Sequence, residues 1–344
     1  EIGVRLVGSE MCIRDSSLEI LELSLISMLY TKVNKINQKE RIMKTVLDIH
    51  GLSKNFDKQA ILQDLHLTIR EGDIYGLIGK NGAGKTTLIK IITQLLFADK
   101  GTVSLFSSHS ENEWSKSLSR VGSVIESPVA HNHLTAYQNL KYYCMIRHIP
   151  NADQVIRETL DYVGLADTGK KIFRDFSLGM KQRLGIAIAL LSKPDFLILD
   201  EPINGLDPIG IKEFRLMIQR LNQEKGITIL ISSHILSELY LVANRFGILD
   251  QGKIIREISK AEFETLSEDY IVLKTADQEK ACQVLKEQIQ LQFKVVNPEN
   301  EIHIFGQEQD VKQILKELTL ADVAIDEIYY ARQNLEEYFT QLVQ

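Results

Sequence analysis

Short apolar runs alternate with helical patterns over most of this chain. The segments VLDIHGL, ILQDLHLTIR and DIYGLIG, which begin at Val46, have the alternation of strands, and Leu88 to Leu96 continues as an apolar helical stretch. Further on, Phe196 to Leu199 is a continuous apolar run, which is typical of a strand buried on both faces of a parallel sheet. The hairpin FGILDQGKIIREIS closes the pattern. We therefore predict an α/β domain over residues 43–258.

A different pattern follows from residue 268 to residue 344. The segments YIVLKT, DQEKACQVLKEQI, FKVVN, EIHIFG, QDVKQILKEL and IDEIYYAR predict the order β-α-β-β-α-β. That order indicates a small α+β domain of the ferredoxin-like kind. NLEEYFTQLV closes the chain as a predicted helix, with apolar residues at 335, 339 and 342. Since no catalytic constellation is visible here, we interpret this part as an accessory domain that stabilises a dimer or regulates it.

The first 42 residues need a separate interpretation. LVGSEMCIRDS resembles a translated sequencing adapter, and codons for Lys39-Glu40-Arg41 can form the purine run of a ribosome-binding site just before Met43. We therefore expect residues 1–42 to be a non-native leader. The alternative is a genuine helix from about Ser17 to Tyr30; a peptide spanning residues 41–44 in the natural protein would rule out the leader. The apolar part of this stretch is too short, and too rich in Glu, for the roughly 20 residues of a membrane span.

Composition narrows the class of partner. A formal charge of −6 over 344 residues argues against nucleic acid, because phosphate backbones favour basic surfaces. Cys12, Cys144 and Cys282 are far apart and odd in number, so they predict neither a disulfide framework nor a zinc site. This cysteine usage fits a reducing cytoplasm.

The run GKNGAGKTT at residues 79–87 matches the phosphate-loop pattern G-x-x-x-x-G-K-[ST] between a predicted strand and a predicted helix. Glycines let the backbone wrap closely around an anion, and the dipole of the following helix favours phosphate. Lys85 brings an ammonium group to the β- and γ-phosphates, and the Thr86 hydroxyl is a hard oxygen ligand for Mg²⁺. The predicted nucleotide-binding residues of this loop are Gly79, Asn81, Gly82, Ala83, Gly84, Lys85, Thr86 and Thr87.

Two adjacent carboxylates follow the apolar run in PDFLILDEP. They stand at the carboxyl end of a predicted strand, where α/β folds bind their ligands. We assign Asp200 to Mg²⁺, and Glu201 to the attacking water as general base, a role worth roughly 10²–10⁴ in rate.

Two further segments and two single residues carry a family resemblance. FSLGMKQR at 176–183 resembles the signature sequence of ABC ATPases, and NGLDP at 204–208 resembles the D-loop of that family. His234, 33 residues beyond Glu201, resembles the switch histidine, and Phe56 stands where the family stacks an aromatic ring on adenine. The resemblance covers about residues 46–255.

The resemblance implies an ABC nucleotide-binding domain of the P-loop class. Its core sheet would be mostly parallel, with an antiparallel β subdomain and a helical signature subdomain over about residues 127–190. Two such domains would enclose two ATP molecules, so that Ser177 and Gly179 would contact the γ-phosphate across the dimer, helped by a helix starting near Lys181. Asp207 of the D-loop segment would also bind nucleotide. Lys85, Glu201 and His234 would be catalytic. A separate transmembrane permease would hold the chain at the cytoplasmic face of the bacterial membrane.

Three positions depart from the family pattern. Leu178 and Met180 replace a glycine and a glutamine of the signature, and Glu126 stands where most members carry a glutamine that contacts Mg²⁺. A glutamate is still a hard oxygen ligand, so the expected metal ligands are Thr86, Glu126 and Asp200. GSVIESP, SLGMKQRLGIA and EPINGLDPIGI look like the bacitracin-resistance and lantibiotic-immunity exporters, which implies removal of antimicrobial peptides.

Alternative functions remain at this point. One is an ABC ATPase that does not serve transport, and another is a nucleotide-dependent sensor with little hydrolysis. His131 and His133 fit no familiar zinc spacing, and we interpret them as part of a loop.

Overall fold

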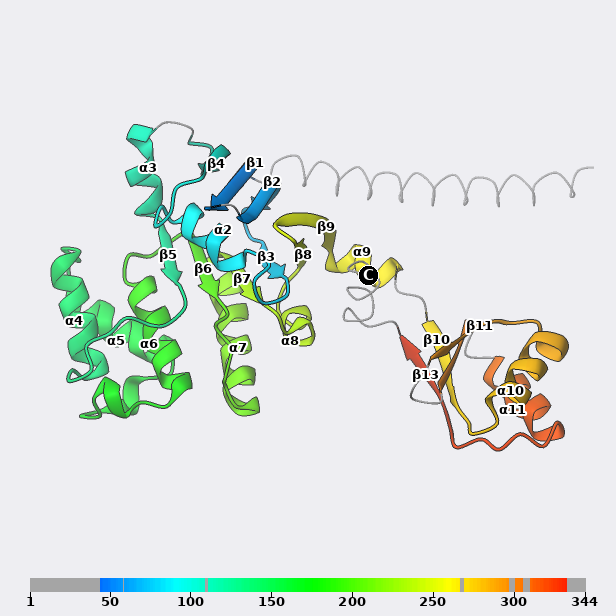
Figure 1. Ribbon diagram of the computed structural model, residues 1–344. Helices are drawn as coiled ribbons and strands as arrows, with labels where there is room; N and C mark the ends of the chain where they lie inside the picture. The colour runs from blue at the N-terminus through cyan, green and yellow to red at the C-terminus, as the bar shows by residue number, and fades with distance from the viewer. Residues whose placement is uncertain are drawn as a thin grey trace, which may run out of the picture. The chain divides into compact units, whose positions relative to one another are not determined.

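The computed structural model describes residues 44–57, 59–108, 111–266, 269–296, 301–305 and 310–332. Its central sheet has six strands in the order β5-β6-β7-β3-β8-β9 (Figure 1). They are β5 Val121–Val124, β6 Phe196–Asp200, β7 Thr228–Ser233, β3 Ile74–Ile78, β8 Arg245–Asp250 and β9 Lys253–Ser259. The first five are parallel, and β9 returns antiparallel to β8 as the predicted hairpin. The structure thus confirms a mostly parallel core sheet.

Strand β6 is buried on both faces, as its apolar run predicts. Leu197 and Leu199 belong to one hydrophobic cluster, whereas Phe196 and Ile198 belong to another on the opposite face. Burial on both faces explains why these strands lack polar alternation. The first cluster includes residues of α7 Pro208–Lys225 and α8 Leu236–Tyr240, and the second includes residues of α2 Lys85–Ile92.

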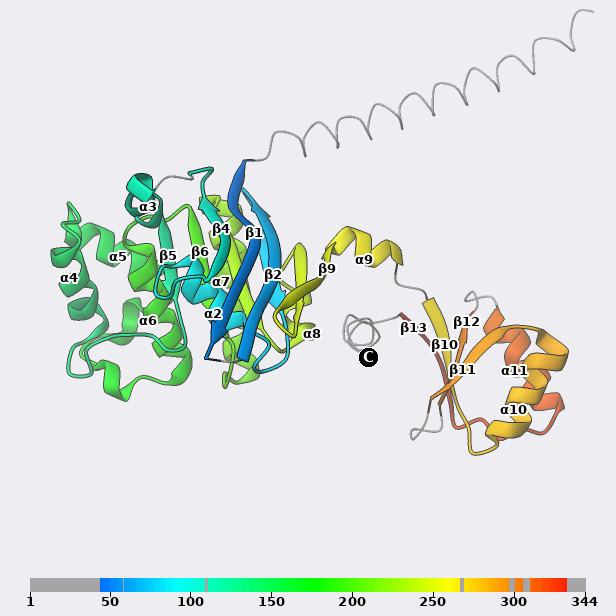
Figure 2. The same ribbon diagram turned by 45° about the horizontal axis from the view of Figure 1, so that its top comes forward.

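A second sheet covers the face that carries α2. It is three-stranded, in the order β2-β1-β4, with bounds β1 Thr45–Phe56, β2 Gln59–Arg70 and β4 Lys100–Leu105 (Figure 2). β1 and β4 pair antiparallel, and inward residues of β1 such as Leu47 and Ile49 are fully buried in the second cluster. The helix α3 Glu111–Leu118 follows β4. This is the predicted antiparallel β subdomain.

A helical layer lies between β5 and β6 in the sequence. It contains α4 Ala136–Ile146, α5 Ala152–Tyr162 and α6 Leu178–Leu190, with short 3₁₀ turns at Ala166–Thr168 and Phe173–Asp175 (Figure 1). Thr135 and Gln138 form a capping box at the start of α4, which satisfies backbone donors of its first turn.

Two predicted helix boundaries are wrong. The helix expected to start near Lys181 begins at Leu178, because the Ser177 hydroxyl accepts a hydrogen bond from the Met180 backbone N–H and so caps it. The apolar stretch that runs to Leu96 leaves the helix after Ile92, where Thr93 is the C-cap. Hydrophobic periodicity does not distinguish a helix from the apolar loop that follows it.

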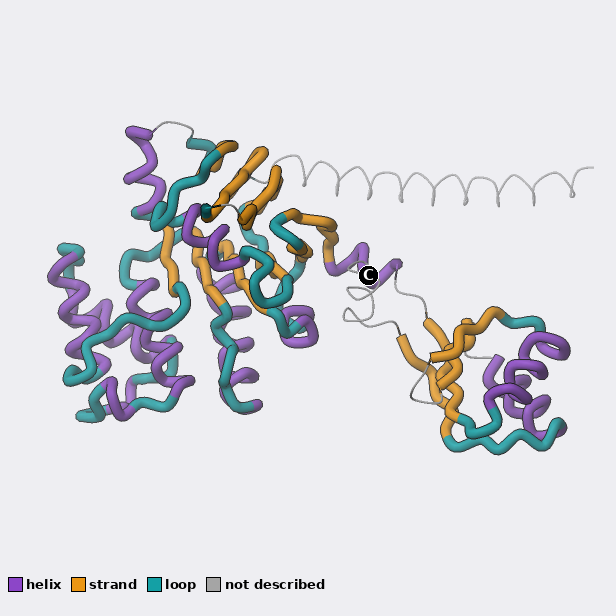
Figure 3. Tube along the Cα trace, in the orientation of Figure 1, coloured by secondary structure: helices purple, strands orange, loops and turns teal. Residues whose placement is uncertain are grey.

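The C-terminal elements have their own sheet and core. The strands β10 Asp269–Lys274, β11 Gln292–Val296, β12 Glu301–Phe305 and β13 Glu327–Arg332 pair antiparallel in the order β11-β12-β10-β13. α10 Gln278–Val284, continued by a π turn at Leu285–Ile289, and α11 Asp310–Leu320 lie on one face of this sheet (Figure 3). The order β-α-β-β-α-β is the predicted one. The predicted helix at 334–343 and the leader at 1–42 lie outside the described residues.

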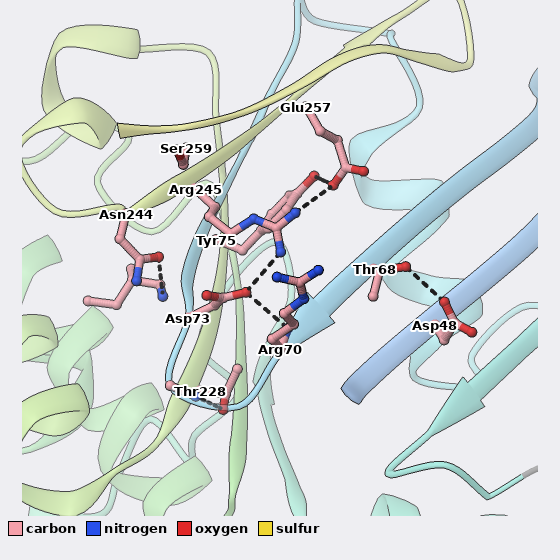
Figure 4. A network of polar contacts seen from close by, with 12 residues as sticks. Asp48, Thr68, Arg70, Asp73, Tyr75, Thr228, Asn244, Arg245, Glu257 and Ser259 are labelled. Atoms are coloured by element: carbon pink, nitrogen blue, oxygen red, sulfur yellow. Dashed lines mark hydrogen bonds and ion pairs between the residues drawn. The ribbon is translucent and has the colours of Figure 1, made fainter. Parts of the chain in front are cut away.

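A partly buried polar network ties the amino end of β3 to the β8–β9 hairpin (Figure 4). The Tyr75 hydroxyl donates to Glu257 Oε1 at 2.6 Å, and Arg245 Nη1 lies 3.4 Å from Asp73 Oδ2. Gly247 is required opposite Tyr75, since a Cβ there would lie 2.1 Å from the Tyr75 oxygen. Burial raises the pKa of Asp73 and raises that of Tyr75 well above its usual range. The network thus attaches the β8–β9 hairpin to the amino end of β3, and the phosphate loop follows the other end of that strand.

Candidate active site

The candidate site lies at the carboxyl ends of three neighbouring strands. β3 ends at Ile78 just before the phosphate loop, β6 ends at Asp200, and β7 ends just before His234. The register places Ile78 beside Ser233 and Asp200 beside Ser232. Parallel pairing therefore brings together residues that are more than 100 positions apart in the sequence.

The glycines of the phosphate loop meet two separate requirements. Gly82 and Gly84 have φ values of 84° and 110°, which other residues rarely adopt. Gly79 does not need a positive φ, but a Cβ at this position would lie 2.6 Å from the Leu249 carbonyl oxygen. At Gly82 a Cβ would meet nothing within 4 Å. The loop is thus held tightly at both ends and open in its middle.

The amino end of α2 offers donors to an anion. Gly84 is its N-cap and supplies no side-chain hydrogen bond to the first turn. The first backbone N–H groups of a helix have no partner within the helix, and the helix dipole favours negative charge there. Lys85 begins the helix and adds a full positive charge. This arrangement fits a phosphate group, as the sequence predicts.

Lys85 is buried and links the loop to the carboxylate strand. Its Nζ donates to the carbonyl oxygens of Gly79 at 2.6 Å and Lys80 at 3.2 Å. The same Nζ lies 3.1 Å from Glu201 Oε1, and the side chain is only 6% exposed. The predicted catalytic lysine and the predicted base are therefore in direct contact.

Thr86 and Asp200 meet where the sequence predicts a metal. The Thr86 hydroxyl donates to Asp200 Oδ2 at 2.8 Å, and the Ser232 hydroxyl donates to Asp200 Oδ1 at 2.6 Å. Asp200 is 3% exposed, so its orientation is fixed by these two bonds. A hydroxyl and one carboxylate beside a phosphate site are the protein oxygens that Mg²⁺ commonly uses. The donor set fits Mg²⁺ bound together with nucleotide phosphates.

Glu201 is held between two predicted catalytic partners. Its Oε2 lies 2.8 Å from His234 Nδ1, while Oε1 faces Lys85. Its backbone has φ 47°, a left-handed conformation that costs about 1–3 kcal/mol in a non-glycine residue. The Glu201 N–H donates to the Ser232 hydroxyl at 2.9 Å, which helps to maintain that conformation. The structure therefore unites Lys85, Glu201 and His234.

Sequence reasoning missed Ser232. This fully buried hydroxyl orients Asp200 and accepts from the Glu201 N–H, so it connects the two carboxylates. The signal was present in TILISSH, because two serines follow the apolar run at residues 229–231 while the strand is still fully buried. A buried polar side chain needs a partner, and here the partners are functional groups.

Glu126 is placed differently from the expected metal ligand. It follows β5 with φ 60°, and its Oε1 lies 2.6 Å from Lys90 Nζ. Lys90 stands one turn beyond Thr86 on α2, so both face the same side of the helix. Among the described residues, no hydrogen bond or ion pair joins Glu126 to Thr86 or Asp200. Its role as a metal ligand stays a prediction.

The predicted nucleotide-binding residues of the signature and of the D-loop segment cap helices of their own chain. Ser177 caps α6, and Asp207 caps α7 by accepting from the Gly210 N–H at 2.9 Å. Within the described part of the chain, no hydrogen bond or ion pair joins Ser177, Gly179 or Asp207 to residues 79–87. A Cβ on Gly179 would meet only Leu206, at an ordinary 3.7 Å.

Leu178, the departure within the signature, packs against the D-loop segment. Its Cδ2 lies 3.0 Å from the position that a Cβ on Gly205 would take. Gly205 also has φ 76°. A glycine is therefore favoured there both by the backbone conformation and by the nearby Leu178 side chain. The apolar side chain thus connects the signature to residues 204–208.

The remaining predicted positions show no catalytic contact. Phe56 ends β1 with 47% of its surface exposed and with Lys54 Nζ 5.6 Å from its ring centroid. The His131 ring packs edge-on against Tyr142. In the described segments, no group of three or more His, Cys, Asp or Glu residues could hold a metal ion. The same segments include no helix long and apolar enough to span a membrane.

Comparisons with known proteins show the family of this chain. The family model described as ABC transporter matches residues 62–204. The bacitracin transport ATP-binding protein BcrA of Enterococcus faecalis is 38% identical over 302 residues, which are 88% of this chain and 97% of BcrA. The lantibiotic transport ATP-binding protein SrtF of Streptococcus pyogenes is 44% identical over 224 residues, 65% of this chain and 95% of SrtF.

A solved structure has the same fold. It is described as the structure of an ATP-binding subunit of an ABC transporter, with 30% identity and a TM-score of 0.55. The match covers 62% of this chain and 90% of the solved one. These comparisons show the family and the fold of the chain, and the assignment of single residues depends on the site geometry.

Proposed function

Because the chain belongs to the ABC transporter family of ATP-binding proteins, we propose that its ATP hydrolysis drives a separate permease that exports antimicrobial peptides. The contact of Lys85 and His234 with Glu201, beside the Thr86–Asp200 pair, carries this proposal. Relatives named for bacitracin and lantibiotic transport support the choice of cargo.

Each residue of the site has a distinct part in hydrolysis. The phosphate loop and the amino end of α2 bind the β- and γ-phosphates through backbone N–H groups, and Lys85 neutralises part of their charge. Thr86 and Asp200 would hold Mg²⁺, which neutralises charge on the phosphate oxygens. Positioning and electrostatic stabilisation of this kind supply most of the catalysis in phosphoryl transfer.

Glu201 accepts the proton of the attacking water. Its carboxylate lies 3.1 Å from Lys85 of the loop, and among the described residues no hydrogen bond joins it to Thr86. His234 fixes one of its oxygens by the 2.8 Å contact. When the phosphates engage Lys85, Oε1 of Glu201 becomes free to face the water. A general base in this position contributes roughly 10²–10⁴ to the rate.

A second copy of the chain would complete each site. Ser177 and the amino end of α6 are well suited to a phosphate, yet they have no contact with the phosphate loop of their own chain. Residues 177–179 of one copy would therefore meet the nucleotide of the other.

We expect the Glu201→Gln protein to dimerise in ATP more than the parent, because its bound ATP is not hydrolysed. Sedimentation velocity measures the fraction of dimer. A Glu201→Gln protein that stays monomeric in saturating ATP would contradict the paired arrangement.

The permease would dock on the segment after Glu126. Val129 and Met145 on this segment are 75% and 66% exposed, and Ile146 is also exposed. Neighbouring exposed apolar side chains of this kind mark protein interfaces. The Lys90–Glu126 pair joins the start of this segment to α2, the helix that follows the phosphate loop. The proposed docking segment is therefore coupled to the loop. Binding there would hold the chain at the cytoplasmic face of the membrane.

Resistance of living cells tests the transport function. Sensitive bacteria that express this chain with its membrane partner should survive bacitracin or a lantibiotic, and Lys85→Met should abolish that survival. Lys294→Met, an exposed lysine on β11 of the C-terminal sheet, is the matched control and should keep it. Equal survival with the parent and with Lys85→Met would refute a transport role that depends on ATP.

A further inference from the structure

A cavity of about 370 Å³ lies away from the nucleotide site. It is bordered by α5, by the turn between α6 and β6, and by the last turns of α7. These elements meet at the amino ends of β6 and β7, whereas the catalytic residues follow the carboxyl ends of the same strands. The walls include Val155, Tyr162, Lys193, Pro194, Leu221 and Lys225.

The floor of this cavity is apolar and its rim is cationic. Pro194, Leu221 and Ile227 are buried, while Lys193 and Lys225 are exposed. Among the described residues, neither lysine forms an ion pair with a carboxylate. A free ammonium group beside an apolar wall favours a ligand that offers both an apolar body and a negative charge.

The carboxylates that line the cavity do not pair with the two lysines. Asp195 pairs with Arg120 at 2.6 Å, outside the lining, whereas Glu158 accepts a hydrogen bond from the neutral Gln154 amide at 2.8 Å and keeps its charge. Among the described residues, no ion pair joins either carboxylate to Lys193 or Lys225. The two ammonium groups therefore have hydrogen-bonding capacity for an anionic ligand.

Tyr162 adds an aromatic wall with two cations near its ring. Arg220 Cζ lies 4.7 Å and Lys225 Nζ 5.4 Å from the ring centroid, and the phenol donates to Glu224 on α7 at 3.2 Å. Burial raises the pKa of Tyr162, so the phenol stays neutral and does not repel an anion. A flat apolar ligand could pack on this wall with its charged end toward the lysines.

We propose that this cavity binds a small amphipathic anion: one ring system or a short alkyl chain that carries a single carboxylate, phosphate or sulfonate. The volume is at the lower end of the roughly 300–1,000 Å³ typical of ligand sites. The lining has neither a glycine-rich loop nor a metal pair, so a nucleotide triphosphate is a poor fit. This inference goes beyond the proposed function and adds a second ligand to the chain.

The position of the cavity gives such a ligand an effect on the ATPase site. α5 packs on α6, whose first residues are the predicted cross-subunit contact, and the Tyr162–Glu224 bond connects α5 to α7. A ligand that bridges α5 and α7 restrains the helical layer against the core sheet. Its binding and that of ATP are then linked, and the linkage acts in both directions.

Fluorescence titration of the full chain with 8-anilinonaphthalene-1-sulfonate tests the site, since this probe combines apolar rings with one sulfonate. We expect one saturable site in the presence of saturating ATP. Replacing both Lys193 and Lys225 by Met should weaken binding about tenfold or more, because two charged contacts are lost. Lys253→Met, which removes an exposed lysine elsewhere, should leave the affinity unchanged.

Val155→Trp provides a second, independent variant, because it fills the cavity and keeps both lysines. It should abolish saturable binding while the thermal unfolding midpoint of the protein is retained. Purely competitive displacement of the probe by ATP, binding that never saturates, or an affinity unaffected by the double lysine variant would each overturn the proposal. If Val155→Trp fails to fold, the lysine variants alone decide.

Discussion

At the scale of single residues, the site depends on a few hydrogen bonds among groups that are far apart in the sequence. Ser232 is central, because its one hydroxyl donates to Asp200 and accepts from the Glu201 backbone. The left-handed backbone of Glu201 is maintained by such contacts.

Ser232→Ala should weaken both stability and metal binding. Asp200 would lose a donor in a buried setting, which costs about 1–3 kcal/mol, and the carboxylate would no longer be held toward Thr86. We expect a lower free energy of unfolding in urea and a higher Mg²⁺ concentration for half-maximal ATPase activity. Ser119→Ala, at an exposed serine, is the control. An unchanged Mg²⁺ requirement would show that Ser232 does not orient the metal ligand.

Asp73 gives a pH dependence of opposite sign to that of most carboxylates. Burial raises its folded pKa above the unfolded value, so the folded state binds the proton more tightly. Its contribution to stability therefore falls as pH rises from about 4 through the folded pKa. Asp73→Asn keeps an acceptor for Arg245 and removes the titration.

Urea denaturation from pH 4 to pH 7 measures this effect. The free energy of unfolding of the parent, minus that of Asp73→Asn, should decrease as pH rises over that range. A difference that stays constant or increases would mean that the Arg245 charge outweighs burial at this carboxyl.

At the scale of elements, the Lys90–Glu126 pair connects α2 to the segment proposed to dock the permease. Both side chains are substantially exposed, and such pairs contribute about 0–1 kcal/mol to stability. We expect Lys90→Glu and Glu126→Lys each to reduce the stimulation of ATPase activity by the permease, with little change in unfolding. The double exchange should restore stimulation. If the exchange behaves as the sum of the single changes, the pair does not connect the two elements.

Features of these elements could be predicted from the sequence where they depend on neighbouring residues, and not where they depend on segments that are far apart in the chain. The parallel strands, the phosphate loop and the β-α-β-β-α-β order follow from local periodicity and spacing. The Lys90 partner of Glu126 and the packing of Leu178 on Gly205 do not, because both contacts depend on how distant segments meet. The start of α6 was missed for a local reason: Ser177 was interpreted as a ligand contact and not also as a cap.

At the scale of the whole molecule, the hydrophobic clusters are formed by two different parts of the sequence. Two clusters contain residues between 46 and 263, and the third contains residues from Ile271 to Val323. Separate cores predict separate unfolding transitions, since cooperativity depends on shared packing.

Calorimetry of the parent should therefore show two transitions. Saturating ATP should raise only the transition of the ATP-binding part, by about 2.7 kcal/mol at 100 times the dissociation constant. Ile304→Ala removes a fully buried side chain of the third cluster and should lower only the other transition, by about 2–5 kcal/mol. A single transition that responds to both changes would contradict independent cores.

The central claim is that Glu201 is the general base of an ATPase, and that ATP binding does not depend on Glu201. The most direct measurement compares ATP binding and single-turnover hydrolysis for the parent and Glu201→Gln, with the membrane partner present. We predict that ATP affinity is retained and that hydrolysis falls about 10²–10⁴-fold. Equal hydrolysis rates would remove Glu201 from that role, and a parent without turnover would make the chain a nucleotide sensor.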